Sequence, residues 1–166
     1  MKTPLLMDFV VDKNTNTIHV KREFDAPVAL VWSAWTESEL LDQWWAPKPW
    51  KAKTRTMDFR EGGHWLYTMI GPEGEEHWAR FNYQTIAPVQ RFVADDMFCD
   101  DHGNPSAELP GGHWTVNFVA QDDATIVKLE IVHDSLSDME KIIEMGFREG
   151  FTMALENLDE LLEGNS

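Results

Sequence analysis

The sequence predicts an α+β domain in which a curved antiparallel sheet of six or seven strands wraps around a long C-terminal helix. Two observations lead to this prediction. Short runs of alternating apolar and polar residues, separated by turn residues, fill the middle of the chain, and near residue 137 the apolar period lengthens from two to three or four. A helix with a broad apolar face must bury that face, and the preceding sheet is the only surface large enough.

The N-terminal part predicts one strand followed by two short helices. Residues 17–24 alternate as expected of a half-buried strand. Pro27 suits the first turn of a helix, and the apolar residues after it recur at helical spacing. Thr36 and Glu39 then form a capping-box pattern for a second short helix, which we expect to end near Trp44.

Six further strands are expected where apolar runs alternate with glycine-, proline- and aspartate-rich turns: 51–59, 64–70, 77–86, 91–98, 113–120 and 125–133. In the extension formed by residues 1–16, Leu6–Val11 could pair with the first strand as a hairpin. The acidic, turn-rich segment 95–112 is expected to be a long solvated loop and not a metal site, since its spacing matches no calcium or zinc motif.

The C-terminal part predicts one long helix. Ser137 and Glu140 form another capping box, and apolar residues from Met139 to Leu162 recur every three or four positions. We expect a single helix of about 25 residues, roughly 38 Å long at about 1.5 Å per residue. Gly150 is expected to mark a close approach of this helix to the sheet, so that a leucine there would clash.

Length and composition favour a single domain, 1–166, and argue against several classes of function. With 43% hydrophobic and 26% charged residues, the chain has no apolar stretch near the roughly 18 residues of a membrane span. Fourteen basic and 29 acidic residues give a net charge of −15, which would repel nucleic acid and anionic lipid surfaces. No export signal is evident and the single Cys99 fits a reducing compartment, so we expect a cytoplasmic protein.

Several short segments carry a resemblance to a known superfamily: 23–27 (Glu-Phe-Asp-Ala-Pro), 31–36, 40–47, 58–65, 83–88 with Arg91, and 144–151. With the order of elements, they resemble the START-like or SRPBCC superfamily of helix-grip proteins, whose members include birch-pollen-allergen-like carriers, polyketide cyclases and lipid-transfer domains. Within it, the chain is similar to bacterial proteins that resemble the C-terminal domain of the heat-shock chaperone ATPase activator. The resemblance covers about residues 17–162 and implies a ligand cavity between sheet and C-terminal helix.

Strand alternation selects residues for the wall of this implied cavity. Trp65, Tyr67 and Met69 share one face of their strand, which we expect to face the helix. Aromatic rings and thioethers suit an apolar ligand, but an aromatic residue at strand spacing is by itself more typical of ordinary core, so the cavity is implied mainly by the resemblance. The candidate ligand-binding residues are Trp44, Trp45, Trp65, Tyr67, Met69, His77, Phe81, Tyr83, Trp114, His133, Phe147 and Phe151.

Three functions remain open at this point. The first is binding of a small hydrophobic or amphipathic ligand by a carrier or sensor. The second is a cyclase- or hydrolase-type enzyme that uses the same cavity, with His77 or His133 as acid–base candidates. The third is a cochaperone-like protein partner. We expect no cofactor, no metal and no membrane insertion; a homodimer is left open, and no residue pattern identifies the ligand.

Overall fold

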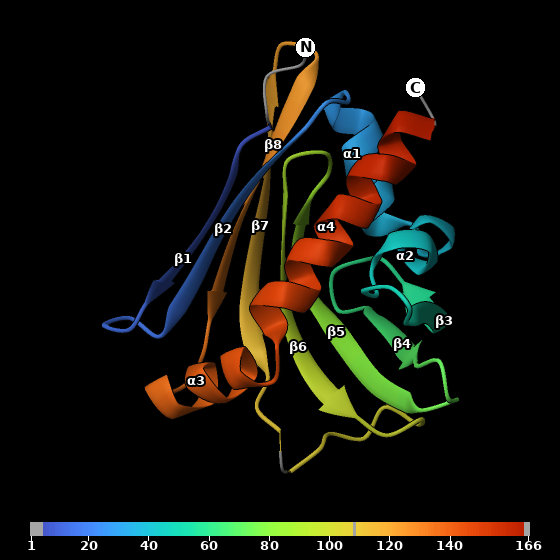
Figure 1. The fold of residues 1–166 in the computed structure, drawn as a ribbon, viewed down its shortest axis with the longest axis vertical. Coiled ribbons are helices and arrows are strands. Elements are labelled where there is room, and N and C mark those ends of the chain that lie inside the picture. Colours follow the sequence, from blue (N-terminus) through green and yellow to red (C-terminus); the bar gives the residue numbers. More distant parts are fainter. Residues whose placement is uncertain (1–4, 108, 165–166) are drawn as a thin grey trace.

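The structure is a computed structural model that describes residues 5–107 and 109–164, and its framework is one antiparallel sheet (Figure 1). The described strands lie side by side in the order β1-β2-β8-β7-β6-β5-β4-β3. They are β1 (Met7–Asp12), β2 (Thr17–Phe24), β3 (Lys51–Asp58), β4 (His64–Ile70), β5 (Glu76–Ala87), β6 (Arg91–Cys99), β7 (Gly112–Gln121) and β8 (Ala124–Val132). The helices are α1 (Val28–Thr36), α2 (Ser38–Trp44), α3 (Leu136–Glu144) and α4 (Phe147–Gly164).

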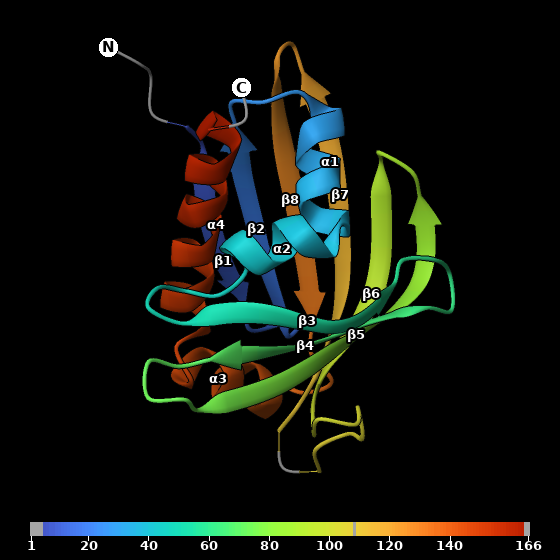
Figure 2. The same cartoon turned by 90° about the vertical axis from the view of Figure 1, so that its right-hand side faces the viewer.

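The sheet is strongly bent around the helices. In Figure 2, β3, β4 and β5 run across the direction of β2, β8 and β7. Helix α4 lies along the concave face, and α2 packs against both α4 and β3. Helix α1 contacts β7, β8 and α4, so the two short helices close one end of the space between the sheet and α4. No helix of the described ranges is long and apolar enough to cross a membrane.

The strand predictions are confirmed, each to within one residue at either end. The sheet nevertheless has eight strands instead of six or seven, because the N-terminal hairpin forms in full. Strand β1 pairs with β2 from Met7 opposite Arg22 to Asp12 opposite Thr17. Asn16, with φ of 54°, occupies the left-handed conformation in the connecting turn, which asparagine tolerates better than most residues.

The prediction of one long C-terminal helix is wrong, because the helix breaks at Met145 and Gly146. Gly146 has φ of +94°, and its amide donates to the Ile143 carbonyl at 3.0 Å, which ends α3. Its own carbonyl accepts from the Gly150 amide at 2.9 Å, which begins α4. Apolar periodicity continues across the break, so the sequence pattern alone did not reveal it.

Two predicted capping boxes also differ from the structure. Helix α2 has Glu37 at its N-cap with no side-chain cap, and the Thr36 hydroxyl instead donates to the Trp32 carbonyl at 2.8 Å. Helix α3 begins two residues earlier than predicted, since the Ser135 hydroxyl accepts from the Asp138 amide at 3.1 Å. Each discrepancy moves a helix start by only one or two positions.

The acidic segment predicted as a loop from residue 95 divides into two parts. Residues 95–99 continue β6, where Asp96 pairs with Phe81 on one side and Gly112 on the other. The loop proper begins at Asp100, whose carboxylate accepts from the His102 and Asn104 amides at 2.9 Å each. No metal-binding group of three acidic, histidine or cysteine side chains occurs in the described part of the chain, and Glu108 lies outside it.

The helix break gives a first test. We expect Gly146→Ala to lower the free energy of unfolding by about 1–2 kcal/mol, because an L-residue is strained at positive φ. A Cβ there would approach nothing closer than Glu149 Oε2 at 4.0 Å, so the effect is conformational and not steric. Urea denaturation measures it, with Gly164→Ala at the end of α4 as control. Equal stability of the two variants would contradict this account of the break.

Candidate functional site

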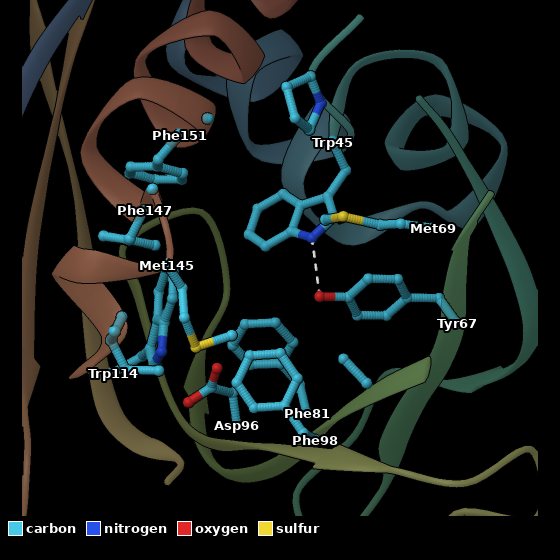
Figure 3. Close-up of a pocket in the computed structure, with 15 residues that line it drawn as sticks. Trp45, Tyr67, Met69, Phe81, Asp96, Phe98, Trp114, Met145, Phe147 and Phe151 are labelled. Atoms are coloured by element: carbon cyan, nitrogen blue, oxygen red, sulfur yellow. Dashed lines mark hydrogen bonds between the residues drawn. The ribbon is translucent and has the colours of Figure 1, made fainter. Parts of the chain in front are cut away.

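A cavity of about 230 Å³ lies between the concave face of the sheet and the α3–α4 break (Figure 3). Its wall is almost entirely apolar and strongly aromatic. The lining residues are Trp45, Pro47, Tyr67, Met69, Ala79, Phe81, Asp96, Phe98, Trp114, Ile142, Met145, Gly146, Phe147, Gly150 and Phe151.

The floor of the cavity is built by cross-strand rows of the sheet. Tyr67 lies opposite Ala79, and Ala79 opposite Phe98, so β4, β5 and β6 each place one residue in a row. In the next row Phe81 lies opposite Asp96. Side chains alternate between the two faces of a strand, and residues two apart therefore reach the same cavity from one strand.

Trp45 forms one wall and connects the cavity to the core. Its indole N–H donates to the Tyr67 hydroxyl at 2.9 Å, which joins the end of α2 to β4 (Figure 3). Its ring lies edge-on to Phe81 and Phe151, with centroid separations of 5.8 and 6.0 Å. Such edge-to-face contacts stabilise aromatic clusters beyond the burial of area alone, so the position of Trp45 is well fixed.

The α3–α4 break supplies the opposite wall. Phe147 and Phe151 stack with ring centroids 5.2 Å apart at the start of α4, and both contact Trp114. Met145 lines the cavity and is also 51% exposed. A residue that reaches both the cavity and solvent marks an opening, so the break at Gly146 forms part of the cavity mouth.

Asp96 is the one charged side chain among the described residues that line the cavity. Its Oδ1 accepts a hydrogen bond of 2.6 Å from the Gly112 amide. Glycine at 112 allows this approach, since a Cβ there would lie 3.0 Å from Ile131 Cγ2 and 3.3 Å from Asp96 Oδ1. The strand pair thus leaves room for a carboxylate that points inward from the sheet (Figure 3).

The surroundings of Asp96 disfavour its charge. Burial raises the pKa of Asp96 from 3.8 to about 6, and the charge of Asp95 acts in the same direction. The Gly112 amide and the Trp114 indole oppose this shift, although no hydrogen bond of normal geometry joins the Trp114 N–H to a described residue. At pH values above the pKa of Asp96, the protein therefore holds a charged carboxylate in an apolar cavity, which is unfavourable.

Asp95, the next residue, lies on the other face of β6 and is ion-paired. The His113 ring contacts the carboxylates of Asp95 and Asp134 at 2.7 and 2.9 Å. The hydrogen bond to Asp95, followed in size of effect by the hydrogen bond to Asp134, raises the pKa of His113. Adjacent aspartates therefore have opposite environments, one paired at the surface and one without a cation in the cavity.

A family model described as Activator of Hsp90 ATPase homolog 1-like protein matches residues 25–163. The chain belongs to this family. The predicted resemblance and the α+β helix-grip class are thereby confirmed. A comparison with curated proteins found no match.

Solved structures of bacterial proteins are similar to this family member over nearly its whole length. Protein Ms6760 from Mycobacterium smegmatis is 28% identical with a TM-score of 0.88, covering 96% of this chain and 97% of that one. A protein from Arthrobacter aurescens is 32% identical with a TM-score of 0.89, covering 95% and 91%. A protein from Staphylococcus epidermidis is 25% identical with a TM-score of 0.82, covering 95% of each chain.

The structure of this family member brings some of the predicted site residues together and not others. The cavity wall includes Trp45, Tyr67, Met69, Phe81, Trp114, Phe147 and Phe151. Three of the remaining aromatic residues pack behind that wall. The Trp44 N–H donates to the Ala34 carbonyl and the Trp65 N–H to the Thr54 hydroxyl, both at 2.9 Å. Tyr83 packs on Phe59 with ring centroids 4.8 Å apart.

The two histidine candidates lie outside the cavity. His77 is exposed, and its ring centroid lies 5.2 Å from that of Trp50. The strand face that alternation predicts to point into the cavity is therefore open to solvent at this end of β5. His133 is buried just after β8, and burial lowers its pKa. The Nδ1 atom of His133 has no hydrogen-bond partner among the described residues.

Sequence reasoning did not name Asp96 and Phe98 as candidates, although both lie in the predicted strand 91–98, because the acidic segment from residue 95 was also interpreted as solvated loop. A signal was present: Phe92, Ala94, Asp96 and Phe98 occupy alternate positions, so a carboxylate falls in the apolar phase of a strand. The expectation for Gly150 is also wrong. A Cβ there would meet only Pro47 Cγ at 3.6 Å, an ordinary contact, so this glycine faces the cavity and not the sheet.

The position of Asp96 predicts a gain in stability on neutralising it. A folded-state pKa raised above the unfolded value destabilises the fold at high pH, and the penalty disappears as pH falls through about 6 toward 3.8. We expect Asp96→Asn to raise the free energy of unfolding at pH 8 by on the order of 2 kcal/mol, with a smaller gain at pH 5.

Denaturation in urea at both pH values measures this gain. Asp95→Asn is the matched control, since it removes the same charge from the outer face of β6, and it should not raise stability. A stability loss for Asp96→Asn at pH 8 would mean that the carboxylate is better satisfied than its surroundings indicate.

Proposed function

We propose that this protein is a cytoplasmic carrier or sensor that holds a small hydrophobic or amphipathic ligand in the cavity between its sheet and its C-terminal helices. The observation that supports this proposal is an aromatic cavity of about 230 Å³ that reaches solvent beside Met145. Ligand sites in proteins are concave and mostly apolar, with a few placed polar groups, and this cavity has that composition.

The volume of the cavity limits the size of the ligand. A cavity of 150 Å³ holds benzene, so by proportion 230 Å³ accommodates roughly nine non-hydrogen atoms without rearrangement. One aromatic ring with a short side chain has that size. Met69 and Met145 line the cavity with flexible thioethers, which allow it to adapt to ligands of somewhat different shape.

An enzyme that transfers protons is the second candidate, and one observation favours it. A carboxyl whose pKa is raised to about 6 lies in the cavity, and general acids and bases work best with a pKa near the operating pH. This candidate requires that the bound molecule is chemically changed. Mass spectrometry of a ligand recovered from the protein before and after incubation distinguishes turnover from storage.

The binding proposal predicts saturable binding of a neutral probe of matching size. Trp45 and Trp114 line the cavity, so 2-phenylethanol should alter tryptophan emission with one-site behaviour. Gly150→Leu should fold but bind at least about tenfold more weakly, because the added side chain enters the cavity beside Pro47. Titration calorimetry and emission spectra measure both effects.

Met153→Leu provides the control for this experiment. Met153 lies on α4, three residues from Gly150, but is 40% exposed and does not line the cavity. Its variant should bind the probe as the original protein does. Undiminished binding by a folded Gly150→Leu protein would place the probe elsewhere and count against the cavity as the site.

A further inference from the structure

We propose that the natural ligand is an organic amine, whose ammonium group pairs with Asp96 while its apolar body fills the aromatic cavity. This inference rests on the proposed binding function and deepens it by naming the chemical class of the ligand. It depends on three features of the described residues: an unpaired carboxylate, the aromatic rings around it, and the sign of charge in and around the cavity.

The carboxylate of Asp96 has room for a cationic partner. Its Oδ1 is occupied by the Gly112 amide, but no described lysine, arginine or histidine forms an ion pair with it. Asp96 is half-buried on the wall of an apolar cavity, and a partly desolvated carboxylate without a cationic partner is unfavourable. An ammonium ligand would supply the missing cation and charge-assisted hydrogen bonds.

Aromatic rings line the same cavity as this carboxylate. Phe81 and Trp114 lie edge-on to one another with centroids 5.1 Å apart, and Phe98 follows two residues after Asp96 on the same strand face. Figure 3 shows these rings and Asp96 bordering one space. The faces of aromatic rings attract cations within about 6 Å, most strongly when water is excluded. The walls therefore favour an ammonium group as well as an apolar body.

The other polar lining groups are the Tyr67 hydroxyl and the indole N–H groups of Trp45 and Trp114, and none of them provides a positive charge. The Tyr67 hydroxyl accepts the Trp45 N–H, and burial keeps the pKa of Tyr67 far above its usual range, so it remains neutral. Among the described lining residues none is cationic. An anionic ligand would thus place its charge near Asp96 without a compensating cation, and we expect the cavity to discriminate against carboxylic acids of the same size.

The charge of the whole chain acts in the same direction. A net charge of −15 gives a negative potential that attracts cations and repels anions before they reach the cavity. With space for roughly nine non-hydrogen atoms, the cavity fits a single ring that carries a short aminoalkyl chain. We therefore use 2-phenylethylamine as the probe.

The test compares three probes that share the phenyl ring and differ in charge: 2-phenylethylamine, 2-phenylethanol and phenylacetate. Titration calorimetry at pH 8 should give the amine an affinity at least about tenfold higher than that of the alcohol, as expected for a charge-assisted hydrogen bond. Phenylacetate should bind most weakly. This comparison uses the unaltered protein and does not depend on the folding of any variant.

Asp96→Asn then identifies the residue that recognises the amine. The variant keeps an oxygen to accept the Gly112 amide but removes the charge, so the amine should lose its advantage while the affinity for 2-phenylethanol stays within about twofold. Retained binding of the alcohol shows that the variant is folded. Asp95→Asn removes an equal charge from the outer face and should leave the preference for the amine intact.

The outcomes separate this inference from the function on which it rests. If the alcohol binds as tightly as the amine, or if Asp96→Asn retains the preference, the amine assignment is overturned and the binding function stands. If none of the three probes binds the folded protein, the binding function and the amine assignment fail together. Amine binding that depends on Asp96 supports both.

Discussion

The position of the Trp45 indole is the constraint on which the cavity depends. Trp45 caps the C-terminal end of α2 and is only 7% exposed, yet one side of its ring faces the cavity. The hydrogen bond to Tyr67 and the edge-on rings of Trp65 and Phe81 hold it from the sheet side. Because the same packing that stabilises the core also fixes the wall, the cavity has a defined shape without a ligand.

Opposite this wall, the break between α3 and α4 forms the other side of the cavity and its opening. A continuous helix would present one unbroken apolar face to the sheet, whereas the turn at Gly146 redirects the chain and leaves Met145 at the opening. Phe147 and Phe151 remain stacked on the interior side. The site therefore combines a firm aromatic wall with a mouth formed at the junction of two helices.

Asp96 differs from the other residues of the cavity wall because its side chain carries a charge. The buried aromatic residues stabilise the fold by leaving water, but a carboxylate in the same space opposes folding whenever it is charged. Side chains that reduce stability are often found at functional sites, where activity requires them. Asp95, the residue before Asp96, provides the contrast. It faces the other side of β6 and its carboxylate is paired with His113.

Sequence by itself determined the order of elements, the strand limits and the inward face of β4, because strand alternation and turn residues are local properties. Tertiary structure alone decided the rest. Three features depend on neighbours that are distant in the chain. They are the left-handed conformation of Gly146, the position of Asp96 opposite Gly112, and the location of His77 and His133 outside the cavity. Periodicity states which residues share a face, but only the packed fold shows where that face leaves a space.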